Sequence, residues 1–219
     1  MKPFLLILSA PTGAGKTTIA RALEGARGDA VSFSVSATTR PPRPAERNGV
    51  DYFFLSHEEF ERRRAADEFL EWAEYGGHRY GTLSAEIDRI LGTGRHVLLD
   101  IDVQGARKIR KRRDDAVMVF ILPPSVEALL ERLRDRGTDG AADLRRRLER
   151  AVHELESIGE YDYIVVNEER NLAIQEVAAI LDAESVRRER RDDMVEEARR
   201  LGDALRKVAA SMPVSGGGG

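Results

Sequence analysis

A loop of small residues between an apolar strand pattern and a helix pattern restricts the fold most strongly. Residues 4–8 are apolar, and residues 9–18 read Ser-Ala-Pro-Thr-Gly-Ala-Gly-Lys-Thr-Thr. Glycines let the backbone curl so that successive N–H groups and a helix N-terminus face one anion. Lys16 then reaches the β and γ phosphates, and the Thr17 hydroxyl can ligate Mg²⁺. The pattern predicts a nucleoside triphosphate site formed by Ala10, Pro11, Thr12, Gly13, Ala14, Gly15, Lys16, Thr17 and Thr18.

Ala10 is the one departure from the usual phosphate-loop pattern G-x-x-x-x-G-K-[ST], which has glycine at this position. Alanine is compatible with the loop if the backbone there keeps a negative φ. A plain glycine-rich turn between strand and helix is the alternative. The preceding strand and the following Lys-Thr pair favour the phosphate loop.

Composition excludes several classes of protein. The chain has 219 residues, of which 42% are hydrophobic, so it can bury one sizeable core with small inserted subdomains. A net charge of −3 gives no reason to expect a nucleic-acid or membrane partner. The absence of cysteine excludes disulfides, thiolate metal sites and a cysteine nucleophile. The N-terminal apolar run is too short for a signal sequence, so we expect a cytoplasmic protein.

Strand and helix patterns alternate along the chain, which predicts an α/β fold with a mostly parallel sheet. We expect strands at residues 4–8, 31–35, 51–55, 96–101, 116–122 and 163–166, and a turn or short strand at 76–81. Helices are expected at 16–24, 84–91, 125–136, 141–158 and from 171. Ser56 and Glu59 form a capping box that begins another helix, expected to extend toward Phe69.

Residues 34–44 combine prolines with Arg40 and Arg43. Prolines fix φ and stiffen the segment, so the two arginines can form a planar phosphate clamp with little loss of entropy. A solvated surface loop is the alternative. Asp100 and Asp102 end an apolar strand pattern, where carboxylates could bind Mg²⁺ through water. The alternative for both carboxylates is ordinary N-capping of the helix that follows.

The remaining charged residues give weaker signals. Arginines are densest in two helix patterns, and we expect Arg132, Arg145 and Arg146 on a solvated face. The second of these patterns carries an apolar stripe at Leu144, Leu148, Val152 and Leu155. The histidines have no metal-ligand spacing and are expected at surface or half-buried positions. They are His57, His78, His96 and His153.

Several linked motifs resemble the guanylate kinase family over about residues 4–185. They are the phosphate loop, Ser-Val-Ser-x-Thr-Thr-Arg-x-Pro-Arg from Ser34, Asp-Tyr-Phe-Phe from Asp51, Tyr-Gly-Thr from Tyr80 and Leu-Asp-Ile-Asp-x-Gln-Gly from Leu99. Later segments match as well: Ile-Leu-Pro-Pro-Ser from Ile121, Arg-Asp-Arg-Gly-Thr from Arg134 and Ile-Val-Val-Asn from Ile164.

The resemblance implies ATP and GMP or dGMP as substrates, with Mg²⁺ as cofactor. It places the GMP phosphate at Arg40, Arg43, Tyr52 and Tyr80, and guanine at Ser36, Glu71 and Asp102, with Thr82 near both. Guanine offers two adjacent donors to a carboxylate such as Glu71, whereas N1 of adenine is an acceptor. Without the resemblance, Glu71 would be interpreted as an exposed carboxylate at a helix end.

The resemblance also implies the domain organisation. It predicts the three-layer sandwich of a P-loop NTPase, with a core of residues 1–34, 95–130 and 155–185, a GMP-binding insert at 35–94 and a helical lid at 131–154. Arg136 and Arg147 match arginines that close over ATP, and Asn167 matches a residue near adenine. A charged helical extension with a disordered glycine-rich end is expected at 186–219, and the oligomeric state stays open.

Phosphoryl transfer to GMP needs no general base, because a phosphate with a second pKa near 6 is largely dianionic at neutral pH. Lys16, Arg40, Arg43, Arg136 and Arg147 are therefore the expected catalytic residues, with Thr17 and Asp100 at the metal. Two alternatives remain. A ribosyl-bisphosphate kinase need not keep the guanine-side residues together, and a guanylate-kinase-like binding module would lose the ATP loop.

Overall fold

The computed structural model describes residues 1–135 and 141–212. Its main sheet has five parallel strands in the order β2 (Val31–Phe33), β7 (His96–Asp100), β1 (Leu5–Ser9), β8 (Val117–Leu122) and β9 (Tyr163–Val166). The phosphate loop leaves β1 at the centre of this sheet. The carboxyl ends of β1 and β7 therefore lie side by side and form the floor of a site.

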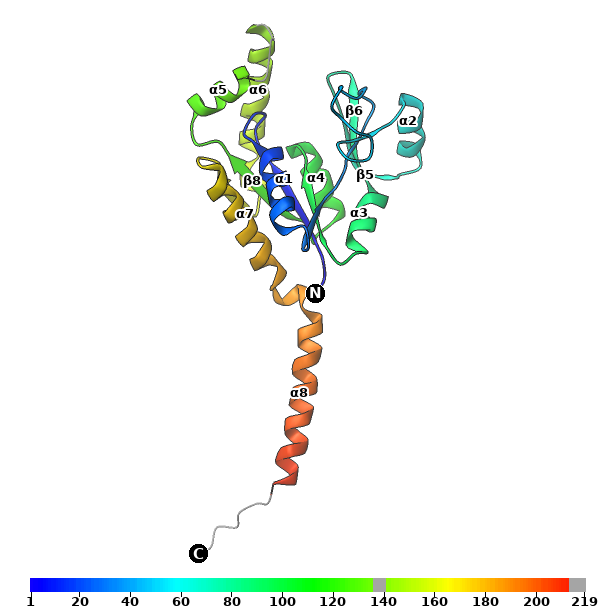
Figure 1. Cartoon of the computed structure of the whole chain (residues 1–219), viewed down its shortest axis with the longest axis vertical. Coiled ribbons are helices and arrows are strands. Elements are labelled where there is room, and N and C mark those ends of the chain that lie inside the picture. The colour runs from blue at the N-terminus through cyan, green and yellow to red at the C-terminus, as the bar shows by residue number, and fades with distance from the viewer. Residues whose placement is uncertain (136–140, 213–219) are drawn as a thin grey trace, which may run out of the picture.

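Helices cover both faces of the main sheet (Figure 1). Alternate residues of β1 enter two different apolar clusters, as the period of a strand requires. Leu6 and Leu8 pack with α1 (Lys16–Arg27) and α7 (Arg170–Ser185), while Leu5 and Ile7 pack with α3 (Ser84–Leu91) and α4 (Val103–Arg112). The result is a three-layer α/β sandwich, which confirms the predicted fold class.

A second, smaller sheet stands beside the main one. Its strand order is β4 (Phe53–Phe54), β3 (Ala37–Thr38), β6 (His78–Leu83) and β5 (Phe69–Tyr75), and α2 (His57–Ala65) packs on it. Its own core joins Ala37, Phe60, Phe69 and Leu83, and the rings of Phe60 and Phe69 stack at 4.4 Å. This sheet brings segments from residues 36 to 83 to one side of the phosphate loop.

Helices α5 (Val126–Asp135) and α6 (Ala141–Glu156) pack together at the opposite side of the loop, and a 3₁₀ turn, η1 (Ile158–Glu160), follows. Their cluster contains Leu129, Leu133 and Ala151, with Leu144 and Leu148 partly buried. The predicted stripe was wrong at Val152, which is 54% exposed. The buried face continues from Ala151 to Glu154 instead, so a carboxylate occupies a position where only apolar residues were expected.

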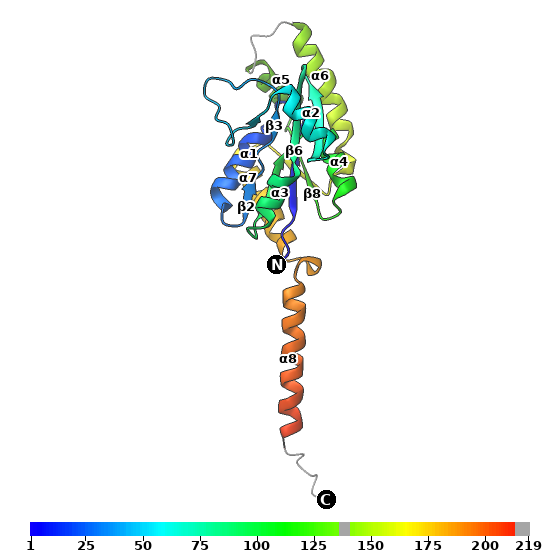
Figure 2. The same ribbon diagram turned by 90° about the vertical axis from the view of Figure 1, so that its right-hand side faces the viewer.

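The chain ends in α8 (Asp192–Ser211), a helix that extends away from the rest of the molecule in both views (Figures 1 and 2). A 3₁₀ turn, η2 (Arg188–Arg190), joins it to α7. Within the described residues, no helix has both the length and the apolar content to cross a bilayer.

Three sequence-based expectations need correction here. The helix from Ser56 ends at Ala65 rather than near Phe69, because Asp67 adopts a left-handed backbone with φ of 52° and turns the chain into β5. The expected strand at 51–55 is only Phe53–Phe54. His96 is fully buried rather than half-buried, accepts a hydrogen bond from the Phe4 N–H and lies beside Ser185. Burial lowers the pKa of His96 to about 4.

Candidate active site

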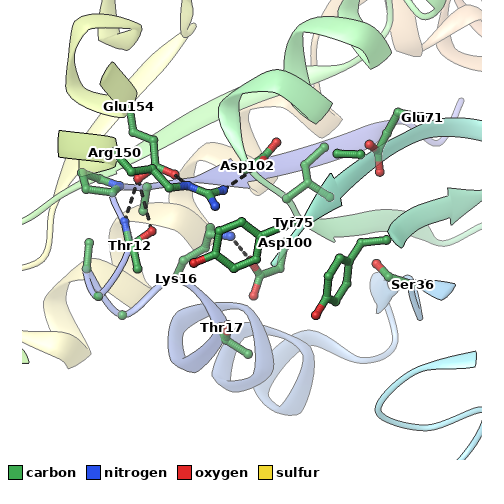
Figure 3. A pocket seen from close by; sticks show the side chains of 18 of the residues that line it. Thr12, Lys16, Thr17, Ser36, Glu71, Tyr75, Asp100, Asp102, Arg150 and Glu154 are labelled. Carbon is green, nitrogen blue, oxygen red and sulfur yellow. Dashed lines mark hydrogen bonds and ion pairs between the residues drawn. The ribbon is translucent and has the colours of Figure 1, made fainter. Parts of the chain in front are cut away.

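One pocket of about 440 Å³ extends from the phosphate loop to the second sheet (Figure 3). It brings together most of the residues that the sequence proposed for two different nucleotides. Those in its wall are Ala10, Pro11, Thr12, Gly13, Ala14, Gly15, Lys16, Thr17, Ser36, Arg43, Tyr52, Glu71, Tyr80, Asp100 and Asp102. Tyr75, Arg150 and Glu154 also line it, and sequence reasoning assigned them no role.

The phosphate loop has the backbone that its glycines predict. Gly13 and Gly15 have φ of 93° and 91°, the left-handed region that favours glycine. Within the described ranges Asp67 is the only non-glycine residue with positive φ, so Ala10 has ordinary backbone. Ala10 is also buried, at 3% exposure. Alanine therefore fits the first position of this loop without strain.

Lys16 donates a hydrogen bond to the Asp100 carboxylate at the end of β7. The Lys16 side chain is 20% exposed and that of Asp100 is 9% exposed. Figure 3 shows this pair in the middle of the pocket, above the start of α1. The ammonium group is thus held at the mouth of the loop, where it can reach the terminal phosphates of a nucleotide.

The loop is held from behind by side chains that sequence reasoning interpreted differently. Asn167 Nδ2 donates to the Ala14 carbonyl at 2.7 Å. Arg132 donates to the carbonyls of Ala14, at 3.3 Å, and Asn167, at 3.2 Å. The prediction that Arg132 lies on a solvated face was wrong, because this helix face packs against the loop. A Cβ at Gly15 would lie 2.7 Å from Asn167 Nδ2, so glycine is required there.

A second contact links the loop to α6. The N–H of Thr12 donates to Glu154 Oε2 at 2.9 Å, and Glu154 is only 4% exposed. Arg150 donates to Glu154 Oε1 at 2.8 Å and to Asp102 Oδ2 at 3.1 Å, as the dashed lines in Figure 3 show. One chain of polar contacts therefore joins the phosphate loop, α6 and the start of α4. The i,i+4 spacing of Arg150 and Glu154 was the available sequence signal, but it is common on exposed helices.

At the far end of the pocket, Glu71 lies on β5 and is 8% exposed, whereas sequence alone suggested an exposed helix end. Thr82 Oγ1 donates to Glu71 Oε1 at 2.7 Å and holds the carboxylate in place. Burial raises the pKa of Glu71 to about 6. Glu71 Oε2 faces Gly105, where a Cβ would lie 3.0 Å from it. Glycine at the first turn of α4 therefore leaves room for the carboxylate.

Asp102 is the N-cap that the sequence offered as one of its two alternatives, and it also faces the pocket. Its Oδ1 accepts a hydrogen bond from the Gly105 N–H at 2.8 Å, so it is the N-cap of α4. Its Oδ2 accepts from Arg150, and the residue lines the pocket. The helix cap fixes the carboxylate in direction, which leaves it pointing toward the same space as Glu71.

Between the two ends lie two tyrosines and the segment with Arg40 and Arg43, which we call the arginine loop. Glu46 accepts from the Arg40 side chain at 2.8 Å and from the Arg43 N–H at 2.7 Å. The hydrogen bond that Arg40 donates to Glu46 raises the pKa of Arg40, so the guanidinium stays charged. The rings of Tyr52 and Tyr80 meet edge-on at 6.1 Å, and burial raises the pKa of Tyr52. Arg43 and the two tyrosines thus line the pocket between its ends, and Arg40 lies beside the Tyr52 ring.

Comparison with known proteins agrees with this geometry. A family model described as guanylate kinase matches residues 2–184. The chain belongs to the guanylate kinase family. It is 47% identical to a guanylate kinase of Symbiobacterium thermophilum over 85% of this chain and 88% of that protein. It is 45% identical to a guanylate kinase of Thermotoga maritima, with 90% and 94% covered.

A solved guanylate kinase structure from Anaplasma phagocytophilum is similar over 89% of this chain and 92% of that one, with a TM-score of 0.71 and 34% identity. Guanylate kinase membership confirms the resemblance found in the motifs. Of the remaining residues proposed from sequence, those that the structure describes lie outside the pocket wall. Three of them contact residues of the wall: Arg40 lies over the Tyr52 ring, Thr82 donates to Glu71, and Asn167 donates to the Ala14 carbonyl. Thr18 and Arg147 are not part of the wall, and Arg136 lies outside the described residues.

Proposed function

We propose that this member of the guanylate kinase family transfers the γ-phosphoryl group of ATP to GMP or dGMP with the residues of the pocket described above. ATP occupies the phosphate-loop end, and GMP occupies the end beside the second sheet. One observation carries this assignment: a single pocket connects a phosphate loop to a buried, hydrogen-bonded carboxylate, Glu71. Such a carboxylate has no role in holding ATP phosphates, since like charges repel.

Guanine recognition is assigned to Glu71, with Ser36 and Asp102. The ionised carboxylate accepts from the N1–H and the exocyclic amino group of guanine. AMP would present an acceptor, N1, to the same oxygen, which leaves a buried carboxylate lone pair without a donor. Thr82 supports the role from behind, because its hydroxyl fixes Glu71 Oε1 and leaves Oε2 for the base.

The GMP phosphate is assigned to Arg40, Arg43, Tyr52 and Tyr80. The Glu46 contacts support this, because they hold the arginine loop in one conformation before the substrate arrives. A planar guanidinium suits bidentate binding of a phosphate. Two anions must be brought in line despite their repulsion, so cations on the acceptor side are needed as much as on the ATP side.

On the donor side, the loop amides and Lys16 hold the ATP phosphates, with Asn167 and Arg132 supporting the loop. We assign residues 35–94 to the GMP-binding insert and residues 131–154 to a lid that brings Arg136 and Arg147 over the transferring group. Closure of the lid would exclude water, which otherwise competes with GMP for the phosphoryl group.

The residues present fit Mg²⁺ bound mainly through water and phosphate. Thr17 and Asp100 both line the pocket, while no group of three or more His, Cys, Asp or Glu side chains in the described residues could form a cage for a metal. Mg²⁺ characteristically keeps several waters and one or two protein ligands in phosphoryl-transfer sites. When bound, it neutralises charge on the β and γ phosphates. ATP and GMP are nucleotides of the cytoplasm, and we therefore propose that the enzyme acts there.

A coupled assay that detects ADP tests the function. ATP is offered with GMP, dGMP, AMP or a ribose bisphosphate as acceptor. We expect turnover with GMP and dGMP and at least about 10²-fold lower kcat/KM with AMP. Preference for the ribose bisphosphate would favour the alternative kinase. Absence of turnover with every acceptor, with GMP binding retained, would indicate a binding module instead.

A further inference from the structure

Arg150 reaches from α6 to the end of the pocket beside the second sheet. Its Nε donates to Glu154 Oε1 at 2.8 Å, and a terminal nitrogen donates to Asp102 Oδ2 at 3.1 Å. Its guanidinium carbon lies 4.3 Å from the centre of the Tyr75 ring. Figure 3 shows Arg150 between Glu154 and Asp102, with a dashed line to each. One side chain therefore contacts α6, the start of α4 and β5.

The charges around Arg150 favour a role other than binding phosphate. Its single guanidinium faces two carboxylates, Asp102 and Glu154, and Glu154 is almost fully buried. A phosphate brought to the same place would meet both negative groups, and like charges repel. A neutral base that offers N–H donors to a carboxylate is attracted there instead. Arg150 is thus suited to act through the carboxylates that it holds.

Asp102 connects Arg150 with the end of the pocket proposed to bind guanine. Donors fix both of its oxygens, because Oδ1 accepts from the Gly105 N–H and Oδ2 accepts from Arg150. A Cβ at Gly105 would lie 3.0 Å from Glu71 Oε2 and 3.5 Å from Asp102 Oδ1, so the two carboxylates border one small space. Burial is the main cause of the raised pKa of Glu71, and the charge of Asp102 adds to it. A cation paired with Asp102 reduces this repulsion.

We propose that Arg150 is a positioning residue for guanine recognition, which holds Asp102 so that it accepts from the exocyclic amino group of the base. The proposal rests on the proposed function, which places guanine at this end. Glu71 accepts from N1–H and from the amino hydrogen next to it. Asp102 accepts from the second amino hydrogen. The pair then selects bases that carry this amino group, because without it a buried acceptor loses its donor.

Tyr75 holds Arg150 from the second sheet. Glu71, Ala73 and Tyr75 alternate along β5 and all line the pocket, so they share one face of the strand. A guanidinium this close to the centre of an aromatic ring is attracted to its face. Arg150 is therefore tied to the strand that carries Glu71 as well as to Asp102. The two acceptors for the base are held in position relative to each other.

Kinetics with two acceptors, GMP and inosine monophosphate, test this role. Both offer N1–H, but inosine monophosphate lacks the amino group. In Arg150→Met we expect the ratio of kcat/KM for GMP to that for inosine monophosphate to fall about tenfold, through KM for GMP. Effects on the phosphate loop through Glu154 act on both acceptors alike and cancel in the ratio. Arg150→Lys, which keeps a cation, should recover part of the loss.

Arg145→Met is the matched control. It removes the same charge from the exposed face of α6, where Arg145 is 82% exposed and pairs with Glu149. The ratio for this variant should equal that of the wild type. An unchanged ratio in Arg150→Met, or the same fall in both variants, would overturn the proposal.

A double variant separates action through Asp102 from direct contact with a substrate. Asp102→Asn keeps an oxygen for the helix cap but removes the charge that pairs with Arg150. If Arg150 acts through Asp102, adding Arg150→Met to Asp102→Asn should change the ratio by less than about twofold. A further tenfold fall would show that Arg150 meets the base itself and would overturn the positioning role.

Equilibrium titration of GMP and inosine monophosphate without ATP keeps the test independent of the reaction. The wild type should bind GMP more tightly, and Arg150→Met should lose about tenfold of that preference. If the wild type shows the preference but does not phosphorylate GMP, the proposed function fails and the role of Arg150 stands. If the wild type phosphorylates GMP and Arg150→Met keeps the full preference, only the role of Arg150 fails. A wild type that binds both nucleotides alike would overturn the proposal.

Discussion

The two ends of the pocket are built in different ways. At the phosphate loop, the groups that face the ligand are mostly backbone amides, and two glycines in left-handed conformation set their direction. At the end proposed to bind guanine they are side chains, and neighbours fix two of them: Thr82 donates to Glu71, and the Gly105 N–H donates to Asp102. A charged phosphate can be held by any curled backbone, whereas a base must be distinguished by particular donors and acceptors.

The buried carboxylate at one end of the pocket lowers the stability of the free protein. The loop amides are neutral groups. Glu71 is a buried carboxylate whose pKa is raised to about 6, so its ionised form is destabilised in the free protein. On the proposed assignment, the base-reading end gives up stability for selectivity. The predictions below separate the two ends, in order of decreasing effect.

The largest expected effect is at the loop. Lys16→Ala should lower kcat by at least about 10²–10³-fold, because it removes the side-chain cation closest to the transferring group. GMP binding should be retained, since Lys16 makes no contact with the guanine end. Steady-state kinetics and a GMP titration measure both quantities, and a thermal melt checks that the variant is folded. Near-normal turnover would refute the loop assignment.

The cost of Glu71 appears in stability. A pKa raised from 4.5 to about 6 corresponds to about 2 kcal/mol, or roughly 30-fold in the unfolding equilibrium. Above pH 6 the folded protein must keep Glu71 ionised, so Glu71→Gln should raise the free energy of unfolding at pH 8 by up to about that amount. The difference should shrink as the pH falls from about 6 to 4.5, where Glu71 is mostly protonated in the folded state and half protonated in the unfolded state.

Urea unfolding at pH 8 and pH 4.5 measures this effect, with Glu176→Gln on the exposed face of α7 as the control. The control should show no pH-dependent difference of this size. If Glu71→Gln were less stable than wild type at pH 8, the carboxylate would be a stabilising group, and the difference between the two ends would disappear.

A moderate effect is expected from the contact between α6 and the loop. Glu154→Gln removes the charge that accepts from Thr12 and Arg150, which should lower kcat/KM for ATP about tenfold. KM for GMP should change less, because Glu154 reaches that end only through Arg150. Glu149→Gln, on the exposed face of α6, is the matched control. Equal changes for both substrates would show that α6 does not act through the loop.

The smallest effect is a steric one at the guanine end. Gly105→Ala places a methyl group 3.0 Å from Glu71 Oε2, so the carboxylate must move by a few tenths of an ångström. We expect KM for GMP to rise a few-fold, by about 1 kcal/mol or less, with KM for ATP unchanged. Gly25→Ala in α1 is the control, since a Cβ there meets nothing within 4 Å. An unchanged KM for GMP would mean that the carboxylate position does not limit binding.

The residues of the phosphate loop could be predicted from sequence more fully than those of the other end of the pocket. The loop is contiguous, so its residues, its glycines and even the tolerance of Ala10 could be derived from local chemistry. The guanine end is assembled from residues 36, 71, 82 and 102 by the folding of a second sheet, and its pattern became visible only through the family resemblance. Glu71 on its own looked like a surface residue.

Long-range packing also explains the failures. Nothing local shows that Arg132 packs on the loop or that Glu154 occupies a buried position, because both depend on how α5 and α6 pack. The prediction that Val152 is buried was wrong for the same reason, since periodicity indicates an apolar face but not the neighbours that cover it. The left-handed residue that ends α2 is Asp67, whereas glycine and asparagine are the usual sequence signals for this conformation. The predicted end of the helix was therefore too late in the chain.

The central claim is that one end of the pocket selects the base while the other holds the triphosphate. Measuring kcat/KM for GMP and KM for ATP in wild type and Glu71→Gln tests it most directly. We predict a loss of roughly 10²-fold or more for GMP with KM for ATP within about twofold of wild type. Equal losses for both nucleotides would contradict the claim.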